Sequence, residues 1–244
     1  MGGDTVLNFV GQSHIGKIRS DNQDSFDYGS FSDDCGFAVV CDGMGGAKGG
    51  SIASAVAVNT VSSVIKSTHK QKMDSDDIRD MLVHACEAAN AEVYRRAARE
   101  PELQGMGTTA VIAYIVDNKA HILHVGDSRA YLISGTKITQ ITSDHSIVQQ
   151  LVDSGEITVE DAKNHPQKNI ITRAVGVDGY LSFDYDTVAM KKNTALLLCT
   201  DGLTNMVSDD AIRKLVSKSK QASDLIDAAL EGGGNDNITA VLVY

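Results

Sequence analysis

The stretch Phe37-Ala-Val-Val-Cys-Asp-Gly-Met-Gly-Gly46 decides the fold of this chain. Its first five residues are apolar or small and predict a short buried strand, and Asp42 follows them directly. The glycines after the carboxylate permit a close approach of backbone or ligand. Taken alone, the pattern is most simply a strand followed by an Asp-Gly turn.

The same pattern occurs twice more along the chain. Residues 196–202, Leu-Leu-Leu-Cys-Thr-Asp-Gly, repeat it, and residues 122–127, Ile-Leu-His-Val-Gly-Asp, repeat it with the glycine first. Three apolar strands that end at Asp42, Asp201 and Asp127 suggest carboxylates that converge from one sheet system onto hard cations. Asp24 and Asp236 lie in polar loops beside strands. Oxygen-only ligands favour Mg²⁺ or Mn²⁺ over zinc.

Composition indicates an ordinary soluble globule. The chain has 244 residues, of which 42% are hydrophobic and 22% charged, enough for a sizeable core. A formal net charge of −10 argues against nucleic acid as the main partner. No apolar run approaches the ~18 residues of a membrane span, and no signal peptide is expected.

The cysteines point to a reduced, cytoplasmic protein. There are four, and none forms a Cys-x-x-Cys pair. No arginine follows any of them six positions later. The Cys-x5-Arg loop of cysteine-dependent phosphatases is therefore absent.

The order of the expected elements favours α+β layering over regular βαβ alternation. We expect helices over 47–66 and from about 75 to 99, and a meander of antiparallel strands over 108–141. Residues 19–26 are too polar for a core strand and predict a turn, whereas 170–175 predict a strand. No linker interrupts 1–244, which indicates a single domain, and the polar segment 146–169 is a candidate flap over a site.

Arg19 adds a phosphate ligand to the predicted carboxylates. It lies five residues before Asp24, and its planar guanidinium suits phosphate oxygens. Two divalent ions roughly 3.5–4 Å apart can generate a hydroxide and aim it at phosphorus. The residues therefore predict a hydrolytic phosphate site without a protein nucleophile.

Six motifs in order make the chain resemble a known family. It is similar to bacterial metal-dependent protein phosphatases of the type 2C serine/threonine family, from about residue 8 to 243. The resemblance implies a four-layer α-β-β-α sandwich of two antiparallel sheets flanked by helices. The motifs are Arg19-x4-Asp24, Asp42-Gly-Met-Gly-Gly, Gly107-Thr-Thr-Ala, Val125-Gly-Asp-Ser-Arg-Ala-Tyr131, Thr200-Asp-Gly-Leu-Thr-Asn and Gly234-Asn-Asp-Asn-Ile-Thr239.

The resemblance also implies a set of metal ligands. Asp42 would bridge two catalytic Mn²⁺ or Mg²⁺ ions, and the Gly43 carbonyl would bind the first. Asp201 and Asp236 would bind the second. A hydroxide bridging the two ions would attack the phosphorus directly.

Further roles follow from the same resemblance. Asp24 would hold metal-bound waters, Arg19 would bind the substrate phosphate, and Asp127 would share a weaker third ion with Asp201. Position 44 is methionine where relatives from higher organisms have a histidine proposed as the general acid. Leaving-group protonation then falls to a metal-bound water or another group.

The implied activity is removal of phosphate from phosphoserine and phosphothreonine in proteins. The implied partners are phosphorylated proteins, including a eukaryotic-like serine/threonine kinase and its substrates, and the implied state is a monomer without membrane contact. Two alternatives stay open: a non-catalytic metal- or phosphopeptide-binding module of this fold, and a phosphatase of small metabolites. His145, in Asp-His-Ser, has no nucleophile elbow beside it and is expected to be structural.

Overall fold

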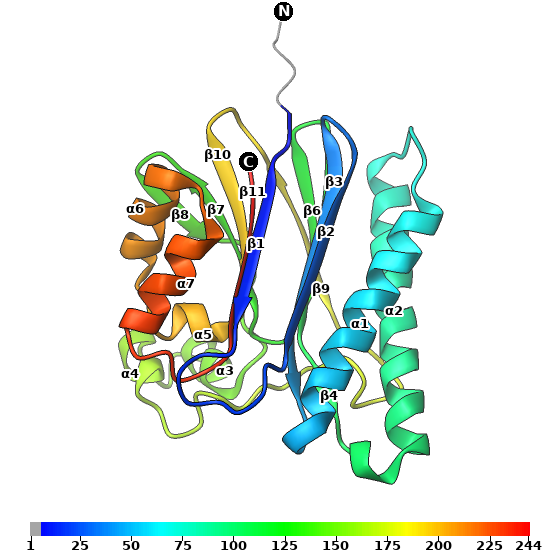
Figure 1. The fold of residues 1–244 in the computed structure, drawn as a ribbon, viewed down its shortest axis with the longest axis vertical. Helices are drawn as coiled ribbons and strands as arrows, with labels where there is room; N and C mark the ends of the chain where they lie inside the picture. The colour runs from blue at the N-terminus through cyan, green and yellow to red at the C-terminus, as the bar shows by residue number, and fades with distance from the viewer. Residues whose placement is uncertain (1–5) are drawn as a thin grey trace, which may run out of the picture.

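The computed structural model describes residues 6–244. Two β-sheets pack face to face at the centre, and helices cover the outer face of each (Figure 1). Helices α1 and α2 lie on one side, and α6 and α7 on the other (Figure 1). This arrangement confirms the predicted four-layer α-β-β-α sandwich.

The first sheet has five strands in the order β1-β11-β10-β7-β8. Every pair in it is antiparallel. Its strands are β1 (Phe9–His14), β7 (Arg129–Ser134), β8 (Lys137–Gln140), β10 (Thr194–Cys199) and β11 (Ile238–Val243).

The second sheet has six strands in the order β2-β3-β5-β6-β9, with β4 paired to the end of β3. Its pairs are also antiparallel. Its strands are β2 (Asp24–Ser32), β3 (Cys35–Met44), β4 (Gly107–Thr108), β5 (Ala110–Val116), β6 (Lys119–Val125) and β9 (Asp184–Ala189).

The helices follow the sequence signals at their ends. Asp74 caps α2 in a capping box with Asp77, directly before the predicted start of the helix at about 75. The helices are α1 (Gly46–Thr68), α2 (Ser75–Arg99), the 3₁₀ turn η1 (Pro101–Leu103), α3 (Ile147–Asp153), α4 (Val159–Lys163), α5 (Asp201–Thr204), α6 (Asp209–Ser219) and α7 (Ala222–Glu231). No described helix is long and apolar enough to cross a bilayer.

The continuous apolar run of β3 reflects burial on both faces of its sheet. Phe37, Val39 and Cys41 pack in the core beneath α1 and α2. Ala38 and Val40 point the other way, into the core between the two sheets. Because both faces are covered, the strand shows no alternation of polar and apolar residues.

Three predictions of local structure are wrong. The meander does not continue past β6, because β6 and β7 belong to different sheets and the chain crosses between them at 126–128. Residues 170–175 form only isolated bridges, at Ile171 and Val175. The polar cluster at 19–26 ends in a strand, since β2 begins at Asp24 and tolerates polar residues at the edge of its sheet.

Candidate active site

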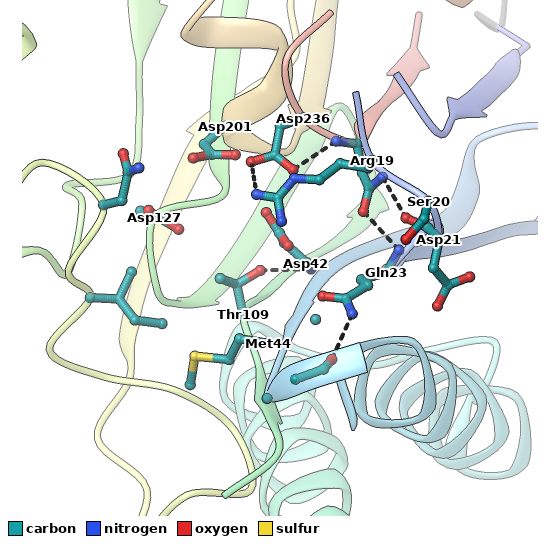
Figure 2. Close-up of a pocket in the computed structure, with 16 residues that line it drawn as sticks. Arg19, Ser20, Asp21, Gln23, Asp42, Met44, Thr109, Asp127, Asp201 and Asp236 are labelled. Carbon is teal, nitrogen blue, oxygen red and sulfur yellow. Dashed lines mark hydrogen bonds and ion pairs between the residues drawn. The ribbon is translucent and has the colours of Figure 1, made fainter. Parts of the chain in front are cut away.

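A cavity of about 500 Å³ opens at the end of the sandwich where the predicted carboxylates meet. Figure 2 shows Asp42, Asp127, Asp201 and Asp236 around it, with Arg19 reaching over from a loop. These residues come from five separate segments of the chain. The rest of the lining is Ser20, Asp21, Gln23, Gly43, Met44, Gly45, Gly46, Thr109, Asn169, Ile171 and Asn237.

Asp42 is held through its main chain. Its N–H donates to Thr109 Oγ1 at 2.9 Å, and its carbonyl accepts from Thr109 N and Thr108 Oγ1, each at 2.8 Å. Gly43 must be glycine, because a Cβ there would lie 2.0 Å from the Gly50 carbonyl oxygen at the start of α1. The hydrogen bonds of Asp42 and the close packing of Gly43 therefore fix the backbone at the end of β3. The Asp42 carboxylate points from there into the cavity.

Asp24 lies behind Asp42 instead of lining the cavity. The two residues are paired across β2 and β3. Asp24 Oδ2 accepts from Thr200 Oγ1 at 2.9 Å and from Thr239 Oγ1 at 2.7 Å, whereas its buried Oδ1 has no hydrogen-bond partner. The prediction that Asp24 acts through water is compatible with this position behind Asp42.

Asp201 and Asp236 face the cavity from the other sheet. Asp201 is the first residue of α5, and its Oδ2 accepts from Asn205 Nδ2 at 3.0 Å, while its buried Oδ1 has no partner. Asp236 lies in the loop before β11, where Oδ1 accepts from Asn237 N at 2.8 Å. Its Oδ2 accepts from Arg19 Nη2 at 2.7 Å. Arg19 is half exposed, so its guanidinium lies at the mouth of the cavity.

Asp127 reaches the same cavity by a different route. It sits in the turn that carries the chain from β6 in one sheet to β7 in the other. Gly126 has φ +102°, and a Cβ there would lie 2.6 Å from a Thr109 methyl carbon. Ser128 Oγ shares a 2.7 Å hydrogen bond with Thr109 Oγ1. Thr109 therefore contacts both the Asp42 strand end and the Asp127 turn.

The electrostatics of the cavity favour bound cations. Burial raises the pKa of Asp24, Asp42, Asp127 and Asp201, and repulsion from neighbouring carboxylates raises each pKa further. Four carboxylates with raised pKa values and two unpartnered buried oxygens form a site short of positive charge. Hard divalent cations with oxygen ligands fit this set of residues.

Sequence reasoning missed the residues that support these carboxylates. Thr109, Thr200 and Thr239 stand inside the quoted motifs, yet only the structure assigns their hydroxyls to Asp42 and Asp24. Asn237 Oδ1 accepts from Gln23 N at 2.8 Å, and its Nδ2 donates to Ile15 O and Asp21 O at 2.9 Å. Thr200 and Asn237 stand directly beside an aspartate in the sequence, but that position does not reveal the contacts that they make across the sheets.

Comparisons with known proteins agree with this geometry. The profile of the family described as Protein phosphatase 2C matches residues 10–232. A serine/threonine phosphatase of Listeria welshimeri is 40% identical over 232 residues, covering 93% of this chain and 92% of the relative. The crystal structure of a serine/threonine phosphatase from Staphylococcus aureus superposes with a TM-score of 0.91 at 35% identity, covering 100% and 96% of the two chains.

A third match concerns a metal-loaded relative. The catalytic domain of the serine/threonine phosphatase PstP, solved in complex with two manganese ions, superposes with a TM-score of 0.83 at 32% identity. The match covers 98% of this chain and 97% of that one. The relatives thus share nearly the whole length of the fold described above.

Proposed function

This chain belongs to the protein phosphatase 2C family and is a serine/threonine phosphatase, and we propose that the cavity described above is its active site. The observation that carries the assignment of the site is the convergence of Asp42, Asp127, Asp201 and Asp236 on one cavity. The proposed reaction is hydrolysis of phosphoserine and phosphothreonine in proteins with two Mn²⁺ or Mg²⁺ ions. The binding-module and metabolite-phosphatase alternatives are not favoured by any observation on the site.

The proposed ligand set is the one that the family resemblance implies, and it is supported by carboxylates that line one cavity. Asp42 and the Gly43 carbonyl would hold the first ion, Asp42 with Asp201 and Asp236 the second, and Asp127 with Asp201 a weaker third. Bound divalent ions supply an activated water as nucleophile and positive charge for the phosphoryl oxygens. Asp24 Oδ1, buried and free of hydrogen bonds, is placed to accept from a water behind Asp42.

The chain's own groups bind and orient the phosphate. The Arg19 guanidinium lies at the mouth, on Asp236 Oδ2, and can turn to phosphate oxygens without leaving the cavity. Met44 and Ile171 are the apolar part of the lining, and none of the residues among 6–244 that line the cavity is a histidine that could protonate the leaving oxygen. We therefore assign that proton to water in the cavity.

The cellular setting is part of the proposal. All four cysteines are free and buried, in keeping with a reducing cytoplasm. We propose a monomeric single domain over 1–244, with 146–169 as its flap, that acts on phosphorylated proteins and opposes a eukaryotic-like serine/threonine kinase.

The test is phosphate release from a phosphothreonine peptide by protein stripped with EDTA, then resupplied with Mn²⁺. Activity is expected only with metal. A panel of small phosphorylated metabolites serves as competing substrates at equal concentration. Binding of phosphopeptide without turnover at any Mn²⁺ concentration would support the binding-module alternative, and faster turnover of a metabolite would support the other.

A further inference from the structure

A second polar cluster lies directly behind the Asp127 turn. His124 and His145 are both buried, and their rings stack with centroids 4.5 Å apart. Arg173 Nη1 lies 2.8 Å from Asp184 Oδ1 and 2.9 Å from His145 Nε2. Asp184 Oδ2 lies 3.3 Å from the same nitrogen. None of these four residues lines the active-site cavity.

The cluster resembles a metal site but does not suit a cation. His124, His145 and Asp184 bring ligand-type atoms within 4.8 Å of one another. However, each ring nitrogen of His145 already faces an N–H group: Gly126 N–H lies on Nδ1 at 3.1 Å and Arg173 Nη1 on Nε2 at 2.9 Å. Neither nitrogen is open to a metal, and the Arg173 guanidinium already supplies positive charge beside the ring.

His145 instead connects three segments of the chain. Its N–H donates to the Gly126 carbonyl at 2.9 Å, and its ring accepts the Gly126 N–H in return. Its own carbonyl accepts from Thr172 N at 2.8 Å. A neighbouring hydrogen bond, from Ile147 N to the Ile170 carbonyl at 3.0 Å, joins the two ends of the flap.

These bonds determine where Asp127 can be. Gly126 is buried and has φ +102°, and both of its peptide hydrogen-bonding groups are satisfied by His145. On the far side of Asp127, Ser128 is tied to Thr109. The carboxylate is thus fixed between two anchors, and one of them is a side chain attached to the base of the flap.

We propose that His145 is a positioning residue for the phosphatase reaction, which holds the Asp127 turn against the flap base so that Asp127 faces the cavity. This inference rests on the proposed role of Asp127 in the weakest ion site. The Arg173–Asp184 ion pair lies against Nε2 and orients the ring. Groups that orient ligands in this way affect metal affinity or activity by about 10–100-fold when removed.

The decisive comparison is His145→Leu against His145→Asn. Leucine keeps most of the side-chain volume but removes the acceptor for Gly126 N–H. The Oδ1 atom of asparagine can replace Nδ1 as that acceptor. For His145→Leu we expect a fall in kcat of about tenfold with little change in KM, and weaker binding of the last Mn²⁺ ion in calorimetry. Faster hydrogen exchange at Gly126 is expected as well, and His145→Asn should restore most of each property.

His121→Leu is the matched control. His121 is also buried and lies on β6 with His124, but its Nδ1 bonds to Tyr185 on the helix-facing side, away from the cavity. The His121→Leu substitution should lower the melting temperature while leaving kcat and Mn²⁺ binding unchanged. Equal losses of kcat in His121→Leu and His145→Leu, or no rescue by His145→Asn, would overturn the positioning role.

Two further measurements distinguish a failure of the positioning role from a failure of the proposed function. If His145→Leu does not fold, Arg173→Gln tests the same network at a partly exposed side chain. A fall of about threefold in kcat supports the proposal, and unchanged kcat and Mn²⁺ binding contradict it. Wild-type protein without any Mn²⁺-dependent phosphatase activity would instead refute the proposed function.

Discussion

Asp42 and Asp127 point into one cavity, but the chain positions them by different means. Asp42 lies within β3, and its main chain is bonded to Thr108 and Thr109 of the adjoining segment. Asp127 lies in a turn that crosses between sheets, and Gly126 beside it is held by a histidine side chain. The first position depends on the sheet and on the two threonine hydroxyls beside it, and the second on a histidine side chain at the base of the flap.

The difference suggests a division of labour between the two positions. A carboxylate held by the sheet and the threonines beside it does not depend on the flap, which suits a tightly held metal ligand. A carboxylate held partly from the flap base can respond to events at the flap. The predictions below test this contrast, in order of decreasing effect.

Metal removal is the largest perturbation, because it acts on both positions at once. Chelation with EDTA should abolish phosphopeptide hydrolysis, since the cavity holds clustered carboxylates and no protein nucleophile is proposed. Mn²⁺ should restore it in a titration followed by phosphate release. Full activity in chelator would remove the basis for assigning either carboxylate to a metal.

Asp42→Asn should cost on the order of a thousandfold in kcat/KM, about 4 kcal/mol of transition-state stabilisation. The amide keeps the shape of the side chain, so the fold should persist, but the charge that we propose is shared by two ions is lost. Steady-state kinetics with calorimetric Mn²⁺ stoichiometry measures both effects. Near-normal turnover with unchanged stoichiometry would show that Asp42 is no ligand.

Asp127→Ala should cost less, about tenfold in kcat, because its ion is proposed to have fewer protein ligands. The two tighter ions should remain bound, and only the weakest calorimetric step should disappear. Excess Mn²⁺ should recover little of the loss. A loss as large as that of Asp42→Asn would end the distinction between the two positions.

Arg19→Ala should raise KM about tenfold and change kcat less, since its guanidinium is proposed to hold phosphate in ground and transition states alike. Arg19→Lys keeps the charge but not the planar guanidinium, and its KM should lie between those of the wild type and Arg19→Ala. The readout is the full dependence of rate on peptide concentration. A collapse of kcat at constant KM would assign Arg19 to the transition state alone.

The contrast between the two positions also explains what the sequence could predict. Apolar runs that end at Asp42, Asp127 and Asp201 are local patterns, so the carboxylates could be predicted from them, whereas the four-layer sandwich was implied by the resemblance to a family. The crossing at Gly126 could not, because strands that follow one another closely indicate a hairpin unless the pairing partners are known. The same limit hid the supporting hydroxyls of Thr109 and Thr200, since a motif gives neighbours in the chain and not contacts across sheets.

Thr109 gives the finest test, because its hydroxyl contacts both positions. Oγ1 accepts the Asp42 N–H at 2.9 Å and shares a bond with Ser128 Oγ at 2.7 Å. Thr109→Val keeps the shape but leaves that N–H without its partner, which costs about 1–3 kcal/mol and should lower the melting temperature by several degrees. We expect kcat to fall only about threefold, because the bonds that Thr109 N and Thr108 Oγ1 donate to the Asp42 carbonyl still hold it. Thr109→Ser keeps the hydroxyl and should restore kcat. If valine removed as much activity as Asp127→Ala, the sheet alone would not be what holds Asp42.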